Sequence, residues 1–325
     1  MDKQTRVRAT SPADLLALAP YLLGFEPTES VVVVAIDEGV TAGVARCDLS
    51  DLEAEPDLAA RAWEALSWPS PGAHAIVLGY GHDSERVARV LQSAVGLIEQ
   101  VAGGLLVDSV SLTDGHSWWS LTDEWQFDPA AGEPYDICPP AVVEAVTAGL
   151  TSSGTRDDLV RSVEGPSRIG GRPFAASVRS QERALRGLSD EDGIAMVLEL
   201  LFRGMAAPAQ MSDDEQARLV VLMQRIPWRD EAWLTQTRAN AEDHQVLWHH
   251  LVGRTPAKWS VPLLALLGFS AWLNGHGALA SIACQRALSL NPRYGMADLL
   301  NTILVKGVHP RLWASMPSIG PGPAA

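Results

Sequence analysis

The residues best placed for chemistry lie where predicted strands begin and end. Ser30 opens an apolar run of valines, and Arg46 and Asp48 close the next extended segment. In α/β sheets, ligands gather where loops leave the strand ends. An arginine beside a carboxylate can clamp a polar group through charge-assisted hydrogen bonds. These three residues therefore form the centre of a candidate ligand-binding site.

Two further kinds of side chain extend this candidate site. The rings of Trp118 and Trp119 are suited to stack on a flat ligand, and Arg156 supplies a second guanidinium group. A structural role is the alternative. In that case Arg46 and Asp48 pair with each other or with Arg156, and the pair joins the sheet to a helix.

Two other segments are candidates for binding a polar ligand or an anion. Asp14 lies in the first turn of a predicted helix, where a favourable interaction with the helix dipole is the alternative to ligand binding. Residues 80–84, YGHDS, lie between a predicted strand and a helix N-terminus, where free backbone N–H groups bind anions. They match neither G-x-G-x-x-G nor the Walker pattern, and an ordinary strand–helix turn is the alternative.

The sequence matches no catalytic or metal-binding pattern. His244, His249 and His250 lack the i, i+4 spacing with which two histidines of one helix hold a metal. A G-x-S-x-G motif is absent, and neither Cys47 nor Cys138 has a histidine nearby in the sequence. We therefore assign no catalytic residue, no metal and no cofactor.

Extended and helical segments alternate through the first half of the chain. Residues 11–36, SPADLLALAPYLLGFEPTESVVVVAI, predict a short helix that ends at Gly24, a turn, and a strand that is apolar on both faces. Such a strand belongs in the middle of a sheet covered on both sides. Further strands are expected at 40–49, 73–80, 105–112 and 118–121. The pattern predicts an α/β fold, with a mixed sheet covered by helices.

Helices dominate the second half, which predicts an all-α domain. They are expected at about 177–187, 190–204, 212–225 and 228–252. The segment GPSRIGGRP at 165–173 is typical of a flexible connection, so we expect an α/β domain over 1–164 and an all-α domain over 174–316. Residues 261–294 resemble one tetratricopeptide-like repeat, because small residues recur where two helices approach closely. These residues are Gly268, Ala271, Gly275, Ala280 and Ala287.

The composition indicates a globular protein without a membrane segment. Hydrophobic residues make up 47% of the 325 residues and charged residues 20%. The longest apolar run of the C-terminal part is too short to span a bilayer, and the N-terminus has no secretion signal. Three widely spaced cysteines are typical of reduced structural thiols. We expect the protein to be cytoplasmic.

The charge is unevenly distributed and disfavours nucleic acid as a partner. The net charge is −14. Residues 255–325 carry five cations against a single anion, Asp298, so the remainder of the chain carries −18. An acidic body repels the phosphate backbone. The basic C-terminal segment suits an acidic partner, or it is a helical cap whose surface is poor in carboxylates.

Several segments are similar to one bacterial family, known as domain of unknown function 4192. They are SPADLL, PYLLGF and ES-VVVV near the N-terminus, RCDL at 46–49, WW at 118–119, TRDDL at 155–159 and NPRYGMADLL at 291–300. The resemblance extends from Ser11 to about Trp313. It implies an architecture and no reaction, so no catalytic residue carries over.

The patterns together favour a non-catalytic binding or regulatory protein. Its helical part would engage a protein partner, for which exposed tryptophans of that half would be anchors if they do not pack in the core. The alternative is an enzyme or small-molecule sensor with a polar site at the strand ends around Arg46 and Asp48. A small-molecule ligand and a homo-oligomer both stay open.

Overall fold

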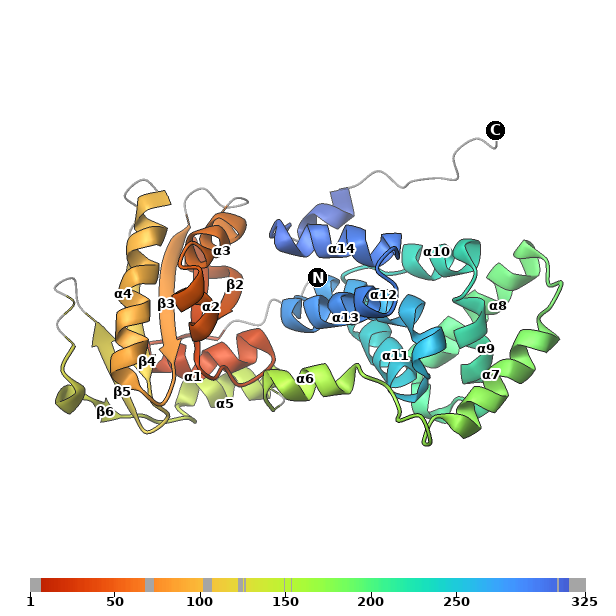
Figure 1. Cartoon of the computed structure of the whole chain (residues 1–325), viewed down its shortest axis with the longest axis horizontal. Helices are drawn as coiled ribbons and strands as arrows, with labels where there is room; N and C mark the ends of the chain where they lie inside the picture. Colours follow the sequence, from red (N-terminus) through yellow and green to blue (C-terminus); the bar gives the residue numbers. More distant parts are fainter. Residues whose placement is uncertain are drawn as a thin grey trace. The chain divides into compact units, whose positions relative to one another are not determined.

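The chain divides into two compact units, Met1–Arg156 and Asp157–Ala325 (Figure 1). The computed structural model describes residues 7–67, 73–101, 107–121, 125, 127–148, 150–152, 154–308 and 310–315. All of the described strands lie in the first unit, and the described part of the second unit is helical. The α/β fold followed by an all-α region is therefore confirmed. The expected domain limits of 1–164 and 174–316 stay a prediction.

The first unit is built on one mixed sheet. Its elements are α1 (Pro12–Leu23), β1 (Ser30–Asp37), β2 (Val40–Asp48), α2 (Leu49–Ala54), α3 (Leu58–Ser67), β3 (His74–Tyr80), α4 (Ser84–Val101), β4 (Val107–Thr113), β5 (Ser117–Leu121), the 3-10 turn η1 (Pro129–Ala131), β6 (Glu133–Pro134) and α5 (Pro140–Thr147). The described strands pair in the order β2-β1-β3-β4-β5-β6. Among the described strands, β3 and β4 form the parallel pair, and α4 connects them as a crossover helix.

The valine strand β1 is buried on both faces, as its sequence predicts. Val31, Val32, Val33 and Val34 are each at most 2% exposed. The strand lies between β2 and β3 and runs antiparallel to both. It is thus an interior strand, but the middle of the sheet is the β3–β4 pair, one place away from the position that the sequence suggested.

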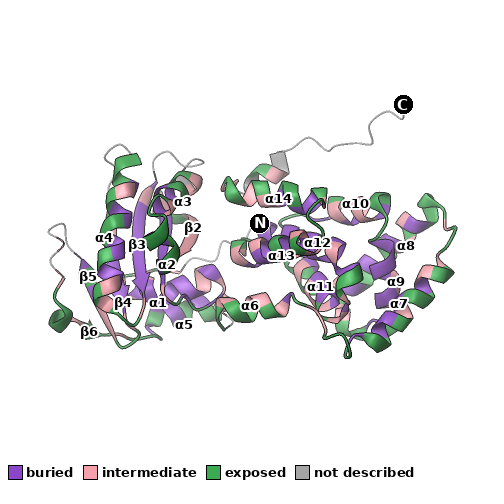
Figure 2. Ribbon diagram, viewed as in Figure 1, coloured by how far each residue is buried: buried purple, intermediate pink, exposed green. Residues whose placement is uncertain are grey.

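Helices cover both faces of this sheet. Val31 and Val33 belong to a core that includes Trp63 of α3 and Leu91 of α4. On the other face, the Tyr80 hydroxyl donates a hydrogen bond of 2.8 Å to the carbonyl oxygen of Leu16 in α1. Figure 2 shows the resulting continuous burial along β3. The two layers explain why β1 carries no polar face.

The second unit is a stack of helices. They are α6 (Arg156–Ser162), α7 (Arg172–Ala184), α8 (Asp190–Ala206), the 3-10 turn η2 (Pro208–Gln210), α9 (Asp213–Leu222), α10 (Ile226–Leu234), α11 (Ala241–Arg254), α12 (Ala257–Leu273), α13 (Gly277–Leu290), α14 (Gly295–Val305) and the 3-10 segment η3 (Pro310–Ser315). Trp228, Trp248, Trp259 and Trp272 are buried in its core. Core packing is therefore the role of these four tryptophans.

The expected single helix over 228–252 is wrong, because the chain breaks between α10 and α11. The side chain of Asn240 accepts hydrogen bonds from the backbone N–H and hydroxyl of Thr237 and donates one to the carbonyl oxygen of Thr235. Such local bonds compete with the helical ladder. They stabilise a turn over residues that the sequence prediction placed inside one helix.

The tetratricopeptide-like segment folds into the helix pair α12–α13. A Cβ atom at Gly268 would lie 2.9 Å from Sγ of Cys284, which shows how closely the two helices approach. Gly275, in the connection, has a φ of 84° that glycine adopts at little cost. The pair packs between α11 and α14, as expected for a single repeat that cannot stand alone.

None of the described helices combines the length and apolarity that a membrane crossing requires.

Candidate functional site

The strand register places several predicted site residues in one row at the end of the sheet. Ser30 pairs with Asp48 on one side and with Tyr80 on the other. Tyr80 pairs with Thr113, which pairs with Trp118. Directly paired residues point to the same face, yet Asp48 and Trp118 are four strand spacings apart, about 19 Å. The predicted residues share an edge and do not converge on one point.

Arg46 and Asp48 pair with each other. Nη2 of Arg46 lies 2.6 Å from Oδ1 of Asp48 and donates a second hydrogen bond, of 2.9 Å, to the carbonyl oxygen of Thr28. The guanidinium also lies over the ring of Phe25, 5.9 Å from its centroid. With its side chain only 10% exposed, Arg46 ties the loop before β1 to the edge strand β2. This geometry matches the structural alternative.

Asp14 completes the N-terminal cap of α1. Its Oδ2 accepts hydrogen bonds from the backbone N–H and the hydroxyl of Thr10, both at 2.7 Å, and from the N–H of Ser11 at 3.1 Å. Burial raises the pKa of this carboxyl group, but the hydrogen bonds from Thr10 and Ser11 outweigh burial and leave the pKa below its usual value. The carboxylate is occupied by the capping box.

Ser30 and Arg156 remain as isolated candidates. The hydroxyl of Ser30 is fully buried and has no hydrogen-bond partner among the described residues. Arg156 is the first residue of α6 and is half-buried. In the described part of the chain, Asp48 forms its ion pair with Arg46 and not with Arg156. Whether any of the predicted residues binds a ligand stays a prediction.

The turn after β3 is closed by the protein's own carboxylates. Oε1 of Glu29 accepts a hydrogen bond of 3.0 Å from the N–H of His82, and Oδ1 of Asp83 accepts one of 2.9 Å from the N–H of Arg86. The Arg86 guanidinium bridges Glu29 and Glu53 at 2.9 and 2.7 Å. Two of the N–H groups that would attract an anion at this helix start are thus already paired. This geometry favours the interpretation as an ordinary strand–helix turn.

His244 is enclosed in the core of the helical unit. It is fully buried, and neither ring nitrogen has a partner among the described residues. Its ring stacks on Trp248 with centroids 6.2 Å apart. Burial lowers the pKa of His244 to about 4, so the imidazole is neutral at physiological pH. Within the described ranges, no three histidine, cysteine or acidic side chains gather in a way that would hold a metal ion.

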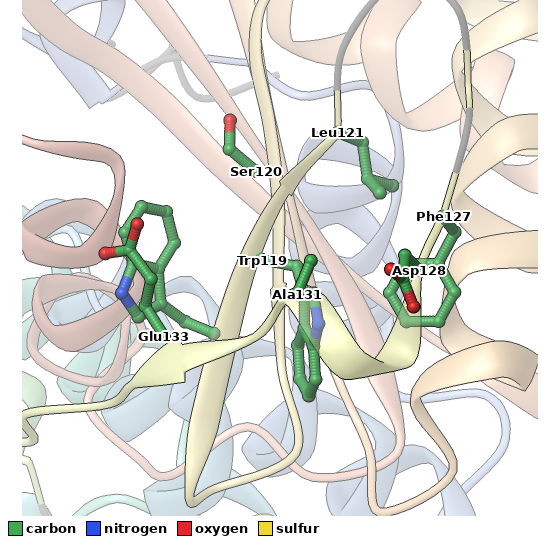
Figure 3. A pocket seen from close by; sticks show the side chains of 8 residues that line it. Trp119, Ser120, Leu121, Phe127, Asp128, Ala131 and Glu133 are labelled. Carbon is green, nitrogen blue, oxygen red and sulfur yellow. The ribbon is translucent and has the colours of Figure 1, made fainter.

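A small pocket lies at the outer edge of β5. Its volume is ≈ 200 Å³, and the residues that line it are Trp118, Trp119, Ser120, Leu121, Phe127, Asp128, Ala131 and Glu133. The rings of Trp119 and Phe127 are 5.7 Å apart. In Figure 3, Asp128 and Glu133 lie on opposite sides of Trp119. Of the residues predicted as ligand-binding, only the tryptophans of β5 line this pocket.

The backbone explains why the pocket forms here. Gly132 lies against the indole of Trp119, and a Cβ atom at this position would come within 2.6 Å of the ring. Asp128 caps η1 by accepting a hydrogen bond of 2.9 Å from the N–H of Ala130. The Gly132 contact and the Asp128 cap therefore both help to hold the loop over β5.

Comparison with known proteins gives the chain a family. One family model matches residues 12–311, nearly the whole chain, across both units just described. The chain belongs to this family, described as a domain of unknown function (DUF4192). No curated protein and no solved structure matches it. Because the description of DUF4192 names no activity, membership assigns no role to any residue.

The sequence interpretation missed most of the pocket. Phe127, Asp128 and Glu133 fall in the stretch 122–139, which lacks helix or strand periodicity and is therefore typical of a loop. One signal was available. Residues 90–155 contain no lysine or arginine, so the carboxylates of this DUF4192 chain are uncompensated along that stretch.

Proposed function

We propose that this protein is a non-catalytic binding or regulatory protein of the bacterial cytoplasm, and that its helical unit docks a protein partner on helix α8. The observation that carries the proposal is an apolar stripe on α8. Phe202 is 75% exposed and Leu198 is 41% exposed. A large exposed aromatic side chain of this kind is typical of an interface anchor.

The stripe follows the periodicity of the helix. Ala195, Leu198, Phe202 and Ala206 are all exposed, and their spacing of three, four and four residues places them on one face. The opposite face of α8, which includes Leu201, packs into the core. The helix thus has two apolar faces, and the core accounts for only one of them.

The border of the stripe indicates the chemistry of the partner. Glu199 and Arg203 lie beside it and are both exposed. Arg203 also pairs with Glu215 of α9, with Nη1 and Oε1 2.5 Å apart. An amphipathic helix with an apolar face and flanking charges fits such a surface. Burying Phe202 would contribute about 2 kcal/mol to binding, roughly thirtyfold in affinity.

The site around Arg46 and Asp48 gives less support to the rival proposal of an enzyme or sensor. The two side chains neutralise each other, and the guanidinium is further engaged by Thr28. A ligand there would have to displace a formed ion pair. The cytoplasmic location is supported by three free cysteines, Cys47, Cys138 and Cys284.

Site-specific photo-crosslinking in the host cell tests the proposal. A benzoylphenylalanine placed at position 202 should give one discrete adduct with a protein. The matched control is position 169, because Ile169 is also 75% exposed but lies outside α8. The same adduct from both positions, or no adduct from position 202, would contradict docking on α8. A doubled subunit mass in the adduct would identify the partner as a second copy.

A further inference from the structure

The sheet of the first unit ends in a long strand, β2, with one unpaired side. β2 is the terminal strand of the order β2-β1-β3-β4-β5-β6, and among the described residues it pairs with β1 alone. With nine residues it is longer than the average strand of about five or six. The other end of the sheet differs, because β6 has two residues and one of them, Pro134, has no N–H to donate.

The register shows which backbone groups face the unpaired side of β2. The N–H of Leu49 donates a hydrogen bond of 2.9 Å to the carbonyl oxygen of Glu29, so the backbone groups of position 49 point towards the β1 side. These groups alternate in direction along a strand, and the pairing has no irregularity in this half of β2. The N–H and carbonyl groups of Val44, Arg46 and Asp48 therefore point away from β1.

The features that usually protect an edge strand are weak in β2. Edges are commonly blocked by proline, by lysine, by inward-pointing charges or by bulges. β2 contains no proline and no lysine, and its one cation, Arg46, already bonds Asp48 and the Thr28 carbonyl oxygen. The register shift of β2 lies near the hairpin, opposite Ala35 and Ile36. The half that ends at Asp48 is thus a regular edge, to which a further strand can be added.

The charge around β2 indicates which kind of strand would be added. Residues 37–64 contain eight carboxylates against two arginines, and both arginines, Arg46 and Arg61, are paired with carboxylates of the same segment. This segment includes α2 and most of α3, which pack against β2. The first unit as a whole carries 23 carboxylates against 8 lysines and arginines, a net charge of −15. Such a field attracts a basic segment and disfavours a second copy of the same unit.

We propose that β2 binds an extended, basic segment of a protein partner, which joins the sheet as an additional strand beside β2. The outward backbone groups of Val44, Arg46 and Asp48 supply the main-chain hydrogen bonds. Lysines or arginines of the segment face the exposed carboxylates of Glu38 and Asp51, which flank the two ends of β2 in the sequence. This surface is separate from α8 and does not depend on the function proposed above.

Calorimetric titration of the full chain with three matched peptides tests the proposal. The probe is Ac-Lys-Thr-Val-Lys-Val-Thr-Lys-amide, which is basic and alternates as a strand does. One control carries N-methyl groups on its three central residues, and the other has glutamate in place of lysine. The probe should bind at least about tenfold more tightly than either control. Equal affinity of either control, or no binding of the probe at about 1 mM, would overturn the proposal.

Substitutions in the chain locate the binding. Val44→Pro removes an N–H that points away from β1, which an edge strand tolerates. The proline ring also obstructs an added strand, so the affinity for the probe should fall about tenfold. The double variant Glu38→Gln, Asp51→Asn should lower it about fivefold. The control is Glu144→Gln, an exposed carboxylate of α5, which should leave the affinity unchanged.

Two results with these variants would overturn the proposal. The first is an unchanged affinity of Val44→Pro for the probe, which would place the binding elsewhere on the chain. The second is self-association of the wild type that Val44→Pro abolishes, measured by sedimentation, which would assign the edge to a second copy. If Val44→Pro does not fold, the comparison of the probe with its N-methylated control on the wild type decides.

Discussion

Lowering the pH should destabilise the helical unit through His244. The pKa of this imidazole is about 4 in the folded protein, against an ordinary value of 6.5, because burial penalises the charged form. Between those two values the unfolded chain binds a proton that the folded chain refuses. The stability that depends on neutral His244 is therefore complete above pH 6.5 and is lost as the pH falls towards 4.

The size of the effect follows from the two pKa values. Going from pH 7 to pH 4, His244 should remove about 3 kcal/mol from the free energy of unfolding. The variant His244→Leu cannot titrate at this position and should lose about 3 kcal/mol less than the wild type over the same range. His116→Gln, in an exposed turn of the first unit, should follow the wild type.

Urea unfolding followed by pulsed hydrogen exchange and mass spectrometry measures this difference. Peptides from α11 and α12 report the helical unit separately from the sheet, which matters because two units need not unfold together. Parallel pH profiles for the wild type and His244→Leu would refute the reasoning, since they would show that His244 ionises as easily in the folded chain as in the unfolded one.

Two further predictions concern a close helix contact and an ion pair, and both are measured as changes in the free energy of unfolding. Gly268→Ala should destabilise the helical unit by about 1–3 kcal/mol, because the new Cβ atom would meet Cys284. Gly253 in α11 has open space around it, so Gly253→Ala should instead stabilise the helical unit by up to about 1 kcal/mol. Arg46→Met should cost about 1–2 kcal/mol, because it removes a largely buried guanidinium that pairs with the partly exposed Asp48 and bonds the Thr28 carbonyl oxygen. The exposed Arg61→Met should cost less than about 1 kcal/mol. These contacts would be contradicted if Gly268→Ala raised the free energy of unfolding while Gly253→Ala lowered it. They would also be contradicted if Arg46→Met left the free energy of unfolding unchanged.

The architecture was predictable because its main signals are local. The valine run of β1 has no polar side, so it requires cover on both faces wherever it lies. The cap of α1 is likewise specified by a few residues: Ser11 accepts from the N–H of Asp14, and Gly24 ends the helix with a φ of 81°. Such features depend on neighbours in the sequence, and the structure contains them as expected.

The break between α10 and α11 falls on a polar stretch. Residues 235–240 read TQTRAN, with Ala239 as the single apolar residue, and the decisive interactions are the side-chain hydrogen bonds of Asn240 with Thr235 and Thr237. An asparagine forms these bonds or points to solvent according to its tertiary surroundings. Periodicity cannot distinguish the two cases.

The candidate site was also predictable only in part, because its geometry depends on residues that are far apart in the sequence. Arg46 and Asp48 are two residues apart in one strand, so their pairing was an open alternative from the sequence. The distance of this pair from Trp118 could not be predicted from the sequence. It depends on the strand order, which places three strands between β2 and β5. The pocket beside Trp118 depends in turn on Phe127 and Asp128, whose loop carries no periodic signal.

Native mass spectrometry tests the central proposal of a partner on α8 most directly. The wild type and the variant Phe202→Ser would be purified from the same host under the same conditions. The proposal predicts that the wild type retains a protein partner, or a second copy, in a defined stoichiometry, and that Phe202→Ser is recovered mainly as the single chain with an unchanged unfolding profile. The same bound species in the same proportion for the two proteins would contradict it.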